Sequence, residues 1–337
     1  MKKIILILLL AVFAFTCSKK VVVNVQKPAQ YNVSDIKRIA VFDFKGPENS
    51  GEIIASKFTN KLWKTQYFSI MERKELNKIL EEHALHMSGI VDNATVVEYG
   101  KIIGVDGIVL GDVTAYKVSA TRGHEKVKEK VWKGDYEKDK NGNIVYEKTR
   151  SGRQKKKVYV EEYVSRVFIN RTVTVGVNFR LVSVQTGEIR ASDSNTKSNT
   201  KKYFPHKGQI PAAEQILDNL SESVLNKFVP LITPHNISVS KEFEEGNDQV
   251  DLGIEYAQKN LWDRAKSIWE AEVNKDPRNS AALYNLGIAY EVLGDFNMAE
   301  QLYNKALDIE PNELYMEAVS NIRQRKLDQK KLQEQLH

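Results

Sequence analysis

Carboxylate and imidazole side chains near the ends of predicted strands are the first residues to consider for chemistry. Asp43, Asp106 and Asp112 lie near the ends of short apolar strands, where α/β enzymes carry their catalytic groups. No glycine-rich phosphate loop, Ser–His pair or metal-ligand spacing accompanies them in the sequence. His83 and His86 are three residues apart, but no further His or Cys is spaced to complete a metal site, so we interpret both as surface or boundary residues. We therefore expect no catalytic residue, no metal and no cofactor, and predict that the protein is not an enzyme.

The single cysteine, Cys17, offers a different chemistry. Two lysines precede twelve apolar residues at 4–15, a stretch that indicates a secretory signal peptide because a helix needs ~20 residues to span a bilayer. Ala14–Phe15–Thr16–Cys17 suggests a lipobox, in which the thiol of Cys17 takes a diacylglycerol and becomes the mature N-terminus. Two or more acyl chains give stable membrane anchoring. The alternative is a leftover cysteine in a removed signal peptide, since Phe15 stands where a small residue is usual.

These residues divide the N-terminal region into a signal peptide at 1–16 and a lipidated polar tether at 17–34. No Asp follows Cys17, which favours a lipid-anchored protein of the outer membrane that faces the periplasm. A lone cysteine also excludes an internal disulfide.

An α/β domain is expected over residues 35–233. The β-branched and aromatic run at 39–44 ends at Gly46–Pro47 and predicts a buried strand. Residues 51–65 carry apolar side chains every four positions and predict a helix, whereas 105–113 predict another buried strand. The order of strand, helix, strand, helix, helix and strand indicates an α/β layer.

Four stretches of this domain, "RIAVFDF", "FSIMERKELNKILEE", "VDGIVLGDVTAY" and "VNFRLVSVQTGEI", resemble the CsgG family. The resemblance covers about residues 36–117 and 171–229. It implies an α+β sandwich with helices flanking a mixed sheet. It also implies a relation to the curli secretion lipoprotein and to the LpoB activators of peptidoglycan synthases, which share the fold. The Glu72–Arg73 pair is part of this resemblance. We interpret it as structural, because a glutamate early in a helix complements the helix dipole and an arginine can pair with a strand end.

Between the two matching blocks lies a basic β-hairpin insertion at 117–170. It holds 15 Lys and Arg against 8 Asp and Glu, a net charge of +7. Asn141–Gly142 predicts a hairpin turn, and Ser151–Gly152 predicts a second. In the curli pore this region spans the membrane, but lysines on both faces of the strand argue against that here. A hairpin that reaches anionic lipid headgroups, cell-wall carboxylates or an acidic protein fits better. A solvated decoration of the sheet is the alternative. The basic patch comprises Arg150, Arg153, Lys155, Lys156 and Lys157.

The C-terminal part contains an internal repeat after a linker at 234–245. Leu252–Gly253, Tyr256, Ala265, Trp269 and Pro277 recur 34 residues later as Leu286–Gly287, Tyr290, Ala299, Tyr303 and Pro311. This spacing is typical of the tetratricopeptide repeat, so we predict two all-α repeats at 246–312 and a capping helix at 313–337. The concave side would present the partner-binding candidates Val250, Ile254, Tyr284, Ile288 and Glu291. Packing within the repeats is the alternative role for these side chains.

Three functions are compatible with this sequence. The first is a non-enzymatic outer-membrane lipoprotein that acts in assembly, transport or organisation at the cell envelope, whose repeats recruit a protein partner. The second is an oligomeric secretion channel of the curli type. The third is an activator of a periplasmic peptidoglycan synthase. We expect contact with the membrane through Cys17, allow for a homo-oligomer, and expect no nucleic-acid partner in an exported lipoprotein.

Overall fold

The computed structural model describes residues 19–83 and 93–336, and it divides into two compact units. The α/β unit comprises residues 35–232, and the helical unit comprises residues 19–34 together with 233–336. Cys17, His86 and the expected signal peptide lie outside the described residues. No helix of the described part of the chain is long and apolar enough to cross a membrane.

The α/β unit is built on a five-stranded mixed sheet, which confirms the predicted fold class. The strand order is β3-β2-β4-β7-β8; β2 runs parallel to β3 and β4, and β7 runs antiparallel to β4 and β8. The strands are β2 (Arg38–Val41), β3 (Ser69–Ile70), β4 (Gly107–Tyr136), β7 (Lys157–Ser183) and β8 (Ile189–Tyr203). The helices are α1 (Ser50–Thr65), α2 (Arg73–Glu82), α3 (Asn93–Ile103) and α4 (Ala213–Ile232).

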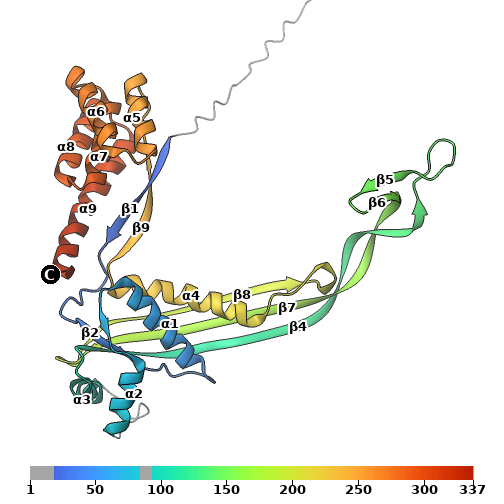
Figure 1. Cartoon of the computed structure of the whole chain (residues 1–337), viewed down its shortest axis with the longest axis horizontal. Coiled ribbons are helices and arrows are strands. Elements are labelled where there is room, and N and C mark those ends of the chain that lie inside the picture. The colour runs from blue at the N-terminus through green and yellow to red at the C-terminus, as the bar shows by residue number, and fades with distance from the viewer. Residues whose placement is uncertain (1–18, 84–92, 337) are drawn as a thin grey trace, which may run out of the picture. The chain divides into compact units, whose positions relative to one another are not determined.

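Helices lie on both faces of this sheet, with α1 and α4 on one side and α2 and α3 on the other (Figure 1). On one face Phe58 of α1 packs edge-on against Phe179 of β7 and Phe228 of α4, with ring centroids 5.5 Å and 6.2 Å apart. On the other, α2 and α3 bury Leu76 and Val96 in a second cluster. Gly51 lets α1 approach the segment that follows β2, since a Cβ there would lie 1.7 Å from the carbonyl oxygen of Phe44.

The basic insertion forms a long two-stranded hairpin. β4 and β7 pair as far as Tyr136 and Lys157, well beyond the last β8 pair at Tyr203 and Ile169 (Figure 1). A smaller hairpin, β5 (Tyr146–Thr149) with β6 (Gly152–Lys155), adds to its tip. Both turns occur where the sequence predicts them, and Gly142 and Gly152 have φ of +83° and +119°, a region that favours glycine.

The helical unit contains five helices that follow the predicted repeats. They are α5 (Asp248–Gln258), α6 (Trp262–Lys275), α7 (Ser280–Leu293), α8 (Phe296–Ile309) and α9 (Glu313–Leu336). The repeated glycines explain how paired helices approach. A Cβ at Gly253 would lie 2.3 Å from Nε1 of Trp269, and one at Gly287 would lie 2.6 Å from the ring of Tyr303.

The expected tether and linker differ from the structure, because each contains a strand. β1 (Lys20–Lys27) pairs antiparallel with β9 (His235–Glu242) over eight residue pairs. Alternate valines explain the strand. Val25 is buried, and Val21 and Val23 pack against the helical core, whereas Val22 between them is 66% exposed. Residues 19–29 are thus a fixed edge of the helical unit and not a free tether.

Candidate protein-interaction surfaces

The predicted concave face of the repeats is covered by the protein's own chain. All five partner-binding candidates are buried; the side chains concerned are Val250, Ile254, Tyr284, Ile288 and Glu291. Segment 241–246, which joins β9 to α5, contacts several of the side chains on this face. These residues therefore do not line an open groove in this structure. The helical periodicity identified the face, but it could not show what covers it.

Phe243 fills the apolar part of this face. It is 3% exposed, and its ring centroid lies 5.9 Å from that of Trp269 and 6.4 Å from that of Trp262. Trp269 is itself fully buried, and its indole N–H donates to the carbonyl oxygen of Val250 at 3.0 Å. Two tryptophans around one phenylalanine give a contact with a large apolar area and a defined geometry.

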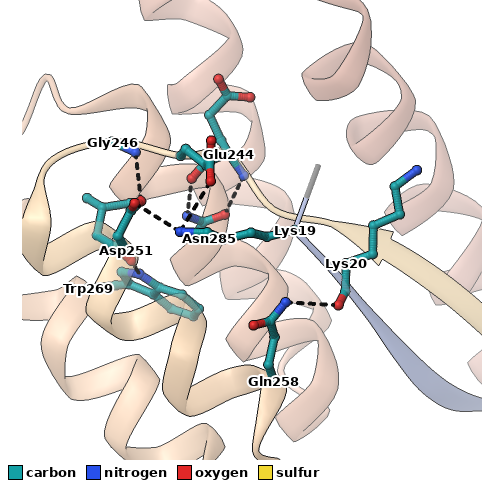
Figure 2. Close-up of polar contacts among 10 residues, drawn as sticks. Lys19, Lys20, Glu244, Gly246, Asp251, Gln258, Trp269 and Asn285 are labelled. Carbon is teal, nitrogen blue, oxygen red and sulfur yellow. Dashed lines mark hydrogen bonds and ion pairs between the residues drawn. The ribbon is translucent and has the colours of Figure 1, made fainter. Parts of the chain in front are cut away.

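The backbone of segment 241–246 is held by side chains of α7 in the way an extended peptide would be. Asn285 accepts a hydrogen bond from the Glu244 N–H at 3.1 Å and donates one to the Glu244 carbonyl oxygen at 2.7 Å (Figure 2). Tyr284 donates its hydroxyl to the Glu242 carbonyl oxygen at 2.9 Å. Burial, followed by nearby carboxylates, raises the pKa of Tyr284, so its hydroxyl stays a donor at neutral pH.

Glu291 is a buried carboxylate that pairs with a lysine and accepts a hydrogen bond from a tyrosine. Nζ of Lys241 lies 2.7 Å from one of its oxygens, and the hydroxyl of Tyr303 donates to the other at 2.8 Å. Burial and then the charge of Glu291 raise the pKa of Tyr303, which keeps that hydroxyl protonated. A buried charge is tolerated when it is paired and hydrogen-bonded in this way. Glu291 therefore helps to hold β9 on the repeats.

The basic patch lies at the tip of the long hairpin and most of it is exposed. Three of its cations lie over aromatic rings: Arg153 over Tyr146 at 5.0 Å, Lys155 over Tyr136 at 5.3 Å and Lys157 over Trp132 at 4.4 Å. Lys156 pairs with Glu137 at 2.6 Å, and Arg150 lies in the turn between β5 and β6. The aromatic rings hold these charges at the surface without neutralising them.

Two of the acidic residues at the strand ends, Asp43 and Asp106, have structural partners. Arg73 forms an ion pair with Asp43, as the sequence suggested, and lies 3.6 Å from Glu52. Asp106 accepts hydrogen bonds from the backbone N–H groups of Lys37 and Arg38 at 3.0 Å and 2.7 Å.

Asp43 and Asp112 line a cavity of about 820 Å³. Within residues 19–83 and 93–336, no group of three or more His, Cys, Asp or Glu side chains could hold a metal ion.

Comparison with known proteins identifies the domain. Residues 11–127 match the family model described as curli production assembly/transport component CsgG. The chain carries a CsgG-family domain. A tetratricopeptide repeat model matches residues 280–313, which span α7 and α8 of the helical unit. Neither is a family of enzymes. The two together indicate a non-catalytic, envelope-associated role that involves protein interaction.

Solved structures give distant likenesses only. This chain is 13% identical to lipoprotein GNA1162 from Neisseria meningitidis, with 57% of this chain and 97% of that chain covered and a TM-score of 0.33. A PelC dodecamer from Paraburkholderia phytofirmans is 12% identical, with 63% of this chain and 98% of that chain covered and a TM-score of 0.27. The LpoB C-terminal domain from Escherichia coli is 10% identical, with 51% of this chain and 86% of that chain covered and a TM-score of 0.28. No curated protein sequence matches the chain.

Proposed function

We propose that this protein is an outer-membrane lipoprotein, anchored through Cys17 and facing the periplasm, that organises or assembles other envelope components. The observation that supports it most is the joining of a CsgG-family domain to tetratricopeptide helices in one chain. The repeats supply protein recruitment, and the α/β unit supplies a second folded surface. Because the concave face is filled by segment 241–246, the partner binds elsewhere on the helices or displaces that segment.

Fractionation of native membranes tests this proposal. We expect the protein to follow outer-membrane fractions in a density gradient, and purified protein to bring down a partner that a version lacking residues 246–337 does not. Recovery of the full-length protein in the soluble periplasmic fraction would contradict the anchored scaffold.

Two other functions remain as outcomes of related measurements. A curli-type channel would give rings with a central hole in negative-stain images of detergent-extracted protein. An activator of a peptidoglycan synthase would bind that enzyme and raise its rate of synthesis in a purified assay. Images without rings together with an unchanged rate of synthesis would favour the scaffold.

The basic patch is proposed as a docking site for anionic groups. Replacing Arg153, Lys155, Lys156 and Lys157 with Gln should leave the melting temperature nearly unchanged, because exposed charges add little to stability. We expect the same variant to bind vesicles that contain phosphatidylglycerol, or peptidoglycan fragments, several-fold more weakly than the parent protein at low salt. The difference should shrink as salt rises, since salt screens exposed charges.

A variant with the same loss of charge elsewhere in the α/β unit is the control. Lys64, Lys74, Lys78 and Lys101 are exposed and lie on α1, α2 and α3. Their replacement with Gln should weaken binding little. Equal losses in the two variants would show a general charge effect and would remove the patch as a specific site.

A further inference from the structure

The first described residue, Lys19, is fixed on the helical unit by both its side chain and its backbone. Its Nζ lies 3.0 Å from Oδ2 of Asp251 (Figure 2). The same atom lies 3.2 Å from Oε1 of Glu245. Its carbonyl oxygen accepts a hydrogen bond from the N–H of Phe243 at 2.9 Å. One residue further on, Gln258 of α5 donates to the carbonyl oxygen of Lys20 at 3.3 Å.

The ion pair of Lys19 and Asp251 holds over the whole physiological pH range. Burial opposes the charge of Asp251, but Lys19 and the Gly246 N–H outweigh it and hold the pKa of the carboxyl below 3.8. The hydrogen bond to Asp251 raises the pKa of Lys19 above 10.5. A carboxyl whose pKa is lower in the folded state stabilises the fold at pH values above its unfolded-state pKa. An amine whose pKa is higher in the folded state stabilises the fold at pH values below its unfolded-state pKa. The contact therefore weakens only in strong acid or strong base.

Residues 20–29 also contact the helical unit along their whole length. After the eight pairs of β1 with β9, Nζ of Lys27 lies 2.6 Å from the largely buried carboxylate of Asp328 on α9. Ala29 then donates its N–H to Gln335 at 2.8 Å, and its carbonyl oxygen accepts from the same side chain at 3.0 Å. The contacts of residues 19–29 thus run from α5 to the end of α9, so that this segment moves with the helical unit.

We propose that the helical unit lies directly on the membrane, with the start of α5 against the lipid headgroups. This inference rests on the proposed acylation of Cys17. Only Ser18 lies between Cys17 and the fixed Lys19, and these two residue steps span at most about 7 Å. A free tether over residues 17–34 could instead span up to about 60 Å. A protein recruited by the repeats would consequently be held close to the same membrane.

A short-range quenching experiment tests this placement. Cys17 is the only cysteine, so once it is acylated a new thiol can be labelled alone. Gln249 is an exposed residue of the first turn of α5, two residues before Asp251. A bimane fluorophore is attached to Gln249→Cys in the full-length acylated protein, which is then reconstituted in liposomes that contain lipids with a nitroxide on the headgroup. We expect strong quenching.

The matched variant carries 20 Gly and Ser residues inserted between Ser18 and Lys19. Such a linker has a typical end-to-end distance of about 25 Å, so quenching should fall several-fold while palmitate incorporation stays unchanged. Weak quenching of the parent protein, or equal quenching with and without the linker, would overturn the placement even though the protein is acylated. Absence of palmitate from the parent protein would instead refute the proposed anchor, and this inference with it.

Discussion

Replacing Cys17 with serine is expected to abolish palmitate incorporation and to leave the protein soluble or unprocessed. The chain has no second cysteine, so no other thiol can take the diacylglycerol. Stable attachment needs at least two acyl chains, and both would be lost with this one side chain. Radiolabelled palmitate and membrane flotation measure the result.

The control for this variant is Ser18→Ala, which changes the next residue and keeps the thiol. Its labelling and flotation should match those of the parent protein. Unchanged labelling of the Cys17→Ser protein would remove the lipoprotein assignment, and with it the membrane placement of the helical unit.

Replacing Trp269 with alanine should destabilise the helical unit by about 3–5 kcal/mol, the usual cost of removing a large aromatic side chain from a core. Trp269 is fully buried, packs against Phe243 and fills the space that Gly253 leaves on α5. Its loss also leaves the carbonyl oxygen of Val250 without the indole donor. We expect a lower urea midpoint for the helical unit, measured by near-ultraviolet circular dichroism, and loss of partner recruitment.

Trp63→Ala provides the matched comparison, because Trp63 is 67% exposed on α1 of the α/β unit. Surface substitutions usually change stability by no more than about 0.5 kcal/mol. Shifts of similar size in the two variants would mean that Trp269 does not hold the repeats together as described.

Local patterns in the sequence predicted most of the elements. These patterns depend only on residues that are close together in the chain. They are the apolar residues every four positions in α1, the 34-residue repeat and the two glycine turns of the hairpin. The order of these elements predicted an α/β layer, whereas the mixed sheet was implied by the resemblance to the CsgG family. The repeat pattern placed Val250 and Ile254 on the concave side as partner-binding candidates, and the structure buries both.

Contacts between distant segments were not predictable in the same way. The alternation of Val21, Val23 and Val25 is visible in the sequence, but its partner strand begins at His235, more than two hundred residues later. Without that pairing the segment resembles a polar tether, and segment 241–246 resembles a linker. Segment 241–246 follows from this pairing and covers the predicted partner-binding face. The burial of that face could therefore not be predicted, because no local sequence pattern indicates that β1 pairs with β9.

The most direct measurement of the central claim, a lipid-anchored envelope scaffold, is the mass of the N-terminal peptide of the mature protein. Trypsin cleavage after Lys19 should release a peptide that begins at Cys17 and carries the mass of a diacylglycerol, with or without a further acyl chain. Hydroxylamine-resistant attachment would place the diacylglycerol on the sulfur as a thioether. A mature protein that begins at another residue, or an unmodified Cys17, would contradict the account.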